Sequence, residues 1–422
     1  MTAPRALRIP RLRKGLTVNA MALMTATIGA QGLGLVFWAA AAHLAPPAAV
    51  GQASAGVAAL TLLAMIAQLN LTNVFVRVLP AAGRLGERLV RRGYLVVVLL
   101  SLTAGAVYCA TGLSDHVVPA GWRHAAQFTL AVPVLAVFAL EDSVLTALRL
   151  APWVAVENIS TAVARIAVLP ALAAAPMGMI GSWVLPAAAA AVVVNALLFA
   201  QALPAHGRGV AGTLPGRRRL LSFVAAEYAG GLCATATMQV MPLLVLARLG
   251  AAQAAYLTLP WLIASGVSLV MWNVAASFVV ETAGARGHPG ALLRRSLLLW
   301  AAVAASAAVV CVAGARPLLS IVGGGYAAHG VTLLRLVGLS APFTAVVVLY
   351  ATLVWLEQRV WLLAGFQAAA GALLLAATLL LLPHAGLSAV GWAYLGTQAV
   401  TAAAVTPLVV RKIRSDEFRR PR

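Results

Sequence analysis

Five charged residues, Arg149 among them, lie close together within an otherwise apolar stretch of the sequence, residues 138–170. Glu141, Asp142 and Glu157 are three of only ten acidic residues in the chain, and Arg165 follows them. Ionisable side chains inside a membrane are costly, and they commonly mark a substrate, ion or proton pathway. The chemistry of this cluster therefore depends on whether the surrounding stretch crosses a membrane.

The amino-acid composition indicates that the chain crosses a membrane. The 422 residues are 62% hydrophobic and only 9% charged, whereas charged residues make up about a quarter of a soluble domain. We predict an all-α polytopic membrane protein, since about 20 apolar residues cross a bilayer as a helix. The twelve predicted spans are residues 18–43, 48–72, 94–113, 125–147, 153–175, 179–203, 222–248, 252–280, 296–314, 330–356, 360–382 and 388–410.

The basic residues are distributed unevenly along these spans. If the N-terminus is cytoplasmic, 25 of the 30 Lys and Arg residues fall on cytoplasmic segments, as the positive-inside rule expects. We therefore predict a plasma-membrane protein with both termini in the cytoplasm, and the net charge of +20 does not indicate nucleic-acid binding. Arg84, Arg88 and Arg91 recur at helical spacing, which suits contact with anionic membrane lipids and equally a role in setting the topology alone.

A basic, Gly- and Pro-containing segment, residues 204–221, divides the spans six and six. The sequence predicts a basic tail at 1–17, a six-helix lobe at 18–203, a cytoplasmic linker at 204–221, a second six-helix lobe at 222–410 and a basic tail at 411–422. Two such halves are typical of transporters that bind substrate in a central cavity between them.

Polar residues recur at helical spacing inside several spans, in five sets: Ser54, Thr61 and Gln68; Asn70, Asn73 and Arg77; Asn158, Thr161 and Arg165; Ser265, Ser268 and Trp272; Tyr394, Thr397 and Thr401. Because lipid offers no hydrogen-bond partners, such sets face protein or water. Each set alone is explained by hydrogen bonds between packed helices. Together they favour a shared polar cavity, with the substrate-binding candidates Arg165, Arg77, Asn158, Thr161, Gln68 and Asn73.

Arg165 is the deepest charge in this scheme. Glu157 precedes it by eight residues, about 12 Å along a helix, so the two cannot neutralise each other directly. Glu141 and its neighbour are expected at a solvated cytoplasmic turn. Arg165 therefore needs an anion from a substrate or from another helix, where Glu227 is the candidate structural partner. Glu157 and Glu227 are assigned structural or coupling roles.

Signatures of enzymes are missing from the sequence. It has no G-x-x-x-x-G-K-[ST] motif for nucleotide phosphates, and its seven His and three Cys residues show no metal-ligand spacing. The loops are too short for a soluble catalytic domain. We expect no enzymatic activity, no cofactor and no metal.

Three segments resemble a known family. The stretch from Asn19 to Pro80, with Phe37-Trp38, Gly51 and Arg77 at matching places, resembles the opening of polysaccharide transporters, the O-antigen type flippases of the multidrug/oligosaccharidyl-lipid/polysaccharide flippase superfamily. The segments "EDSVLTALRLAPWVAVENISTAVARI" and "PLLSIVGGGYAAHGVTLLRLVGLSAP" are similar to two later parts of that pattern.

The resemblance implies a two-lobed, V-shaped transporter that moves isoprenoid-diphosphate-linked glycans outward, together with other polysaccharide-assembly membrane proteins. It also implies basic residues in the central cavity, for which Arg165 and then Arg335 are the candidates. His43 stands where the family often has Arg.

Three functions remain to be distinguished. The leading hypothesis is a flippase for a lipid-linked oligosaccharide. The first alternative is a cation-coupled antiporter for drugs or metabolites on the same fold, which needs a carboxylate within the membrane to bind the ion. The second alternative is a membrane glycosyltransferase or glycan ligase, which needs acid/base residues on large outer loops.

Overall fold

The computed structural model describes residues 16–209, 217–284, 289–357 and 359–414, and gives only the backbone for some helical residues, 16–28 and 217–227 among them. Its described elements are all helices. Those of the first half are α1 (Leu16–Leu44), α2 (Pro47–Gln68), α3 (Leu71–Ala82), a 3-10 turn η1 (Gly83–Leu85), α4 (Gly86–Ala110), α5 (Trp122–Ala147), α6 (Ala151–Leu172), α7 (Gly178–Leu197), a π-helical turn η2 (Leu198–Ala202) and α8 (Leu203–Gly209). Those of the second half are α9 (Arg217–Leu249), α10 (Ala251–Gly284), α11 (Pro289–Ala313), α12 (Ala315–Val322), α13 (Gly324–Leu356), α14 (Val360–Ala385) and α15 (Ser388–Arg414).

Ten helical segments within the described residues are long and apolar enough to cross a membrane. Helices α1 and α9, with 29 and 33 residues, have sufficient length as well. The prediction of a polytopic helical membrane protein with about twelve transmembrane helices is confirmed.

Two details of the helix boundaries differ from the sequence prediction. Helix α2 ends at Gln68 because Leu69 and Asn70 adopt left-handed backbone conformations, with φ of 48° and 58°, which cannot continue a right-handed helix. Asn73 and Arg77 therefore belong to a separate helix, α3, instead of extending α2. The predicted linker also begins inside a helix, since α8 continues to Gly209.

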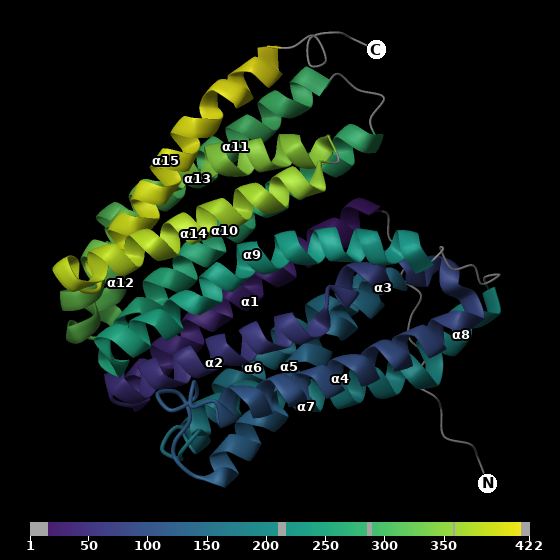
Figure 1. The fold of residues 1–422 in the computed structure, drawn as a ribbon, viewed down its shortest axis with the longest axis horizontal. Coiled ribbons are helices and arrows are strands. Elements are labelled where there is room, and N and C mark those ends of the chain that lie inside the picture. The colour runs from purple at the N-terminus through teal and green to yellow at the C-terminus, as the bar shows by residue number, and fades with distance from the viewer. Residues whose placement is uncertain (1–15, 210–216, 285–288, 358, 415–422) are drawn as a thin grey trace.

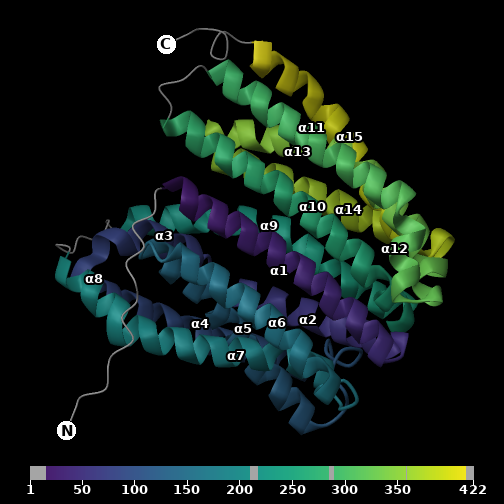
Figure 2. The same ribbon diagram turned by 180° about the vertical axis from the view of Figure 1, so that it is seen from behind.

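The helices form two lobes, α1–α8 and α9–α15, which lie close together at one end and separate toward the other (Figure 1 and Figure 2). Helix α1 begins and α15 ends at the separated end, which the charge distribution predicts to be cytoplasmic. The cores follow this division. One apolar core includes residues of both lobes, while a second, around Met271, Phe278 and Trp300, draws on C-terminal-lobe helices alone.

The tightest contact between the lobes is a crossing of α2 and α10. A Cβ placed on Gly51 would lie 1.8 Å from the carbonyl oxygen of Ala251 and 2.7 Å from the backbone nitrogen of Ala255. About one turn farther along, the Thr258 hydroxyl donates to Ser54 Oγ across the same contact at 2.9 Å. Only glycine at position 51 permits the backbones of α2 and α10 to approach this closely. Gly51 therefore allows the two lobes to meet at the predicted outer end.

Candidate functional site

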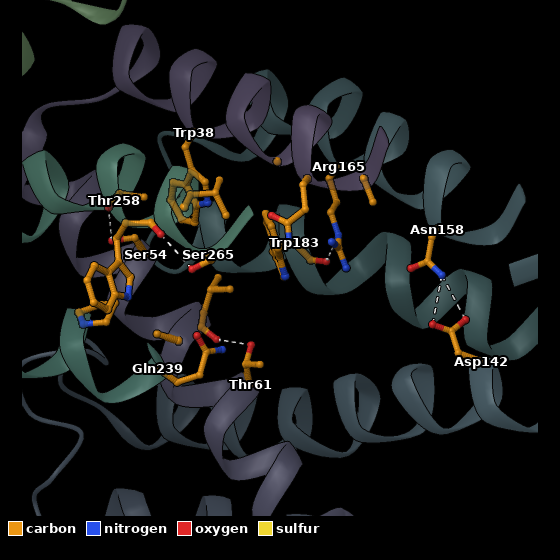
Figure 3. Close-up of a pocket in the computed structure, with 18 of the residues that line it drawn as sticks. Trp38, Ser54, Thr61, Asp142, Asn158, Arg165, Trp183, Gln239, Thr258 and Ser265 are labelled. Atoms are coloured by element: carbon orange, nitrogen blue, oxygen red, sulfur yellow. Dashed lines mark hydrogen bonds between the residues drawn. The ribbon is translucent and has the colours of Figure 1, made fainter. Parts of the chain in front are cut away.

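A cavity of about 650 Å³ lies between the lobes. Helices of both lobes line it, and Figure 3 shows side chains from each converging on it. Its volume is within the usual range for a small-molecule site, about 300–1,000 Å³. The polar and aromatic lining residues are Gln31, Trp38, Ser54, Thr61, Asp142, Ser143, Thr146, Asn158, Arg165, Trp183, Gln239, Thr258, Trp261 and Ser265.

Arg165, on α6, provides the positive charge of this cavity. Its guanidinium carbon lies 4.2 Å from the centre of the Trp183 ring and 5.8 Å from that of Phe138, and its Nε donates to the Trp183 carbonyl oxygen. Within the described residues it forms no ion pair; the side chain of Glu227, its predicted structural partner, lies outside them. Aromatic faces attract a cation but do not neutralise it, so Arg165 retains its positive charge for an anion entering the cavity.

Asp142 and Asn158 form the second polar group on the same side of the cavity. The Asn158 amide nitrogen lies 3.1 Å from both carboxylate oxygens of Asp142 (Figure 3). The contact joins α5 to α6 and holds the carboxylate at the cavity wall. The cavity is therefore lined on its N-terminal side by a hydrogen-bonded carboxyl group and, at a separate place, by an arginine.

A pair of carboxyl groups is buried behind this wall. Glu141 is 0% exposed and Glu157 is 5% exposed. Their carboxyl groups are neighbours in the interior of the lobe, and Asn195 on α7 donates to Glu141. The remaining oxygen of Glu141 and both oxygens of Glu157 have no donor among the described residues. Two neighbouring carboxyl groups that have no cationic partner in the described part of the chain can share a proton.

The solvated position expected for Glu141 is wrong. Helix α5 continues to Ala147, so Glu141 lies more than a turn before its end and faces the interior of the lobe. The sequence indicated an acidic residue near a turn, but could not show which helices cover it.

The C-terminal lobe supplies an uncharged wall. Trp261 on α10 lines the cavity, and its indole nitrogen donates to the Met238 carbonyl oxygen on α9. Gln239 and Ser265 also line this wall. The wall therefore offers an aromatic face and polar groups without a charge.

Two of the predicted substrate-binding residues, Arg165 and Asn158, line the cavity, as do Ser54, Thr61 and Ser265 from the polar sets. These residues come from α2, α6 and α10, so the fold brings together three sets that are far apart in the sequence.

The structure places the other predicted residues elsewhere. Thr161 is buried with its hydroxyl unpaired among the described residues. Gln68 donates to the Ala136 carbonyl oxygen on α5, and Asn73 donates to Asn70. Arg77 is exposed on α3. Arg335 is exposed and donates to the Val312 carbonyl oxygen, so it is not among the residues lining this cavity.

Sequence reasoning missed several residues of the site. Trp183 and Gln239 belong to none of the polar sets, and Trp38 was noted only for the family resemblance, so no spacing pattern marked them as cavity residues. Asp142 was noticed but was expected at a solvated turn. Within the described residues, no group of three or more His, Cys, Asp or Glu side chains is arranged to hold a metal ion.

Comparison with known proteins defines the fold. The sequence matches no protein-family model and no curated protein. Among solved structures, it is similar to the inward-facing conformation of a multidrug resistance MATE family transporter of the MOP superfamily, with a TM-score of 0.65 and 13% identity over 93% of this chain and 98% of that one. The chain has the fold of a MATE transporter.

Two further MATE structures extend this finding. The MATE multidrug transporter DinF-BH gives a TM-score of 0.60 and 17% identity over 94% of both chains. An outward-facing MATE conformation gives 0.58 and 13% identity, over 94% of this chain and 95% of that one.

Proposed function

We propose that this protein is an alternating-access antiporter that exports an amphipathic organic anion in exchange for a cation. The observation that carries the proposal is Arg165, a cation in the central cavity with aromatic neighbours and no carboxylate partner among the described residues. Such a residue attracts a carboxylate or phosphate, and the Trp rings beside it accommodate the apolar part of the same molecule.

The carboxyl pair supports the exchange of a cation. Glu141 and Glu157 lie inside the membrane-spanning part of the N-terminal lobe, on α5 and α6, the same helices that carry Asp142 and Arg165. This arrangement supplies the intramembrane carboxyl group that the antiporter hypothesis requires. The similarity to MATE structures named as multidrug transporters supports the antiporter hypothesis. The cavity volume of about 650 Å³, suitable for a drug-sized molecule, also fits it.

A flippase for an isoprenoid-diphosphate-linked oligosaccharide is the second candidate. It is favoured by Arg165 itself, because the planar guanidinium matches phosphate oxygens with two parallel hydrogen bonds. The resemblance of the sequence to polysaccharide transporters supports it as well. The comparisons with solved structures support the antiporter at least as well as this candidate.

Transport into inside-out proteoliposomes tests the proposal. An amphipathic anionic dye is expected to accumulate when a proton gradient is imposed, a cationic dye of similar size is expected to accumulate less, and Arg165→Ala should abolish uptake of the anion. Equal transport of both dyes by the wild-type and Arg165→Ala proteins would refute the proposal. Deletion of the gene separates the candidates, since loss of a flippase leaves lipid-linked glycan on the cytoplasmic face.

A further inference from the structure

We propose that a second pocket, inside the C-terminal lobe, binds an uncharged, hydroxyl-rich ring of the transported molecule, namely a sugar. This inference rests on the proposed function, because it assigns one part of the substrate to each lobe: the anionic group to Arg165 and a glycosyl group to the C-terminal lobe. It narrows the substrate class to glycosylated amphipathic anions.

The pocket has a volume of about 410 Å³ and lies among α9, α10, α13, α14 and α15. It is therefore built by one lobe and does not depend on how the two lobes meet. Its volume is again within the range of small-molecule sites. Two of the polar sets noted in the sequence gather here, since Ser268, Trp272, Tyr394 and Thr397 all line it.

No charged side chain lines this pocket among the described residues. A charged ligand would lose its hydration without gaining a counter-charge, which is unfavourable in a site within a membrane-spanning lobe. The pocket thus differs from the central cavity, where Arg165 and Asp142 supply both signs of charge. Its chemistry selects a neutral ligand.

Side chains with unpaired hydrogen-bonding groups line the pocket and favour a ligand that is polar as well as neutral. Thr397 is only 5% exposed, and its hydroxyl has no partner in the described part of the chain. The side-chain amides of Gln367 and Gln398 line the pocket and likewise form no hydrogen bond there. Amides and hydroxyls both donate and accept, which matches sugar hydroxyl groups. An apolar ligand would leave these groups unsatisfied.

Aromatic side chains in the pocket lining also suit a sugar ring. Trp272, Phe366 and Tyr394 line the pocket beside the amides. Flat apolar faces next to a few convergent polar groups are the usual composition of a small-molecule site. A sugar ring presents C–H groups on its faces and hydroxyls at its edge, so it uses both kinds of surface at once.

The pocket shares a wall with the central cavity. Trp261 lines the cavity and packs edge-on against the ring of Tyr394, with centroids 5.6 Å apart, and Tyr394 lines the pocket. The same indole donates to the carbonyl oxygen of Met238, another residue of the pocket. Trp261 therefore adjoins both sites, and we assign the two groups of one molecule to these neighbouring sites.

Binding of paired ligands to the full-length protein in nanodiscs tests this inference. The probes are decyl methyl phosphate and decyl glucosyl phosphate, which have the same chain and the same single negative charge. Isothermal titration calorimetry is expected to show about tenfold tighter binding of the glucosyl ester, the effect of roughly two net hydrogen bonds.

Two variants and a matched control test whether the extra affinity for the glucosyl ester arises in this pocket. Thr397→Val and Gln367→Leu should remove the advantage of the glucosyl ester while leaving affinity for the methyl ester unchanged. Thr378→Val is the control, because Thr378 lies on α14 outside the pocket lining and donates to the Leu374 carbonyl oxygen of its own helix. This control should keep the full advantage. Wild-type thermal stability in all three variants verifies folding.

The outcomes separate the inference from the proposed function. If both esters bind equally, and binding depends on Arg165, the sugar subsite is refuted and the anion exporter stands. If neither ester needs Arg165, the proposed function fails, and neutral decyl glucoside then tests the pocket alone. Binding of this glucoside that is lost in Thr397→Val supports the pocket; no binding, or binding unchanged by the substitution, refutes it.

Discussion

Replacement of Gly51 by alanine is expected to open the outer contact between the lobes. The added Cβ would lie 1.8 Å from the Ala251 carbonyl oxygen, whereas ordinary contacts begin near 3.4 Å. The backbones of α2 and α10 must therefore separate by about 1.6 Å. Overpacking of this kind costs about 1–3 kcal/mol. The cost falls on the conformation closed at the outer end, so the inward–outward equilibrium should shift toward outward by about 5- to 150-fold.

Labelling of a single cysteine measures this shift. Thr61 lines the central cavity away from the contact, so Thr61→Cys in a protein lacking Cys109, Cys233 and Cys311 reports access to the cavity. A membrane-impermeant maleimide applied from outside is expected to react slowly with the parent protein. The addition of Gly51→Ala should increase the rate by the factor derived above, up to the limit set by the reagent.

The control is Gly266→Ala, also on α10, where a new Cβ meets no heavy atom within 4 Å. It should label like the parent. If the Gly51→Ala protein folds normally and also labels like the parent, the α2–α10 crossing does not set the balance between the two conformations.

Other predictions address the site and the topology. Arg165→Lys should retain part of the anion transport and Arg165→Ala none, at similar protein levels in membranes; a fall in abundance for alanine alone, restored by Glu227→Gln, would instead reveal a structural ion pair. Glu157→Gln should leave binding of anionic substrate intact, measured by calorimetry, but remove the response of transport to an imposed proton gradient. Cysteines introduced in the 204–221 linker should react only from the cytoplasmic side, and outside labelling would contradict the predicted orientation.

The sequence predicted the architecture because that prediction rests on properties of whole segments. Length and apolarity predict the number of spanning helices, the distribution of Arg predicts their orientation, and the basic segment 204–221 marks the predicted division into lobes. The break after Gln68 was missed because Leu69 has no local preference for the left-handed conformation it adopts. Tertiary contacts, absent from a local pattern, determine that turn.

The candidate site was only partly predictable for a related reason. Arg165 could be identified as a candidate from its own segment, because a charged residue deep in an apolar helix is unusual whichever way its side chain points. Gln68 and Ser54 lie on one helix face, yet Gln68 binds the backbone of α5 and Ser54 lines the cavity. The pairing of Glu141 with Glu157 needs the packing of α5, α6 and α7, which spacing within one helix does not determine.

The position of Arg165 over the Trp183 ring also gives the protein an intrinsic optical signal. Indole emission responds to the electric field of a nearby charge, and here the guanidinium lies 4.2 Å from the ring centre. An anion that binds Arg165 changes this field, so the emission spectrum of Trp183 should report occupancy of the cavity without an attached dye. Subtraction of the spectrum of a Trp183→Phe protein isolates this signal from that of the other nine tryptophans.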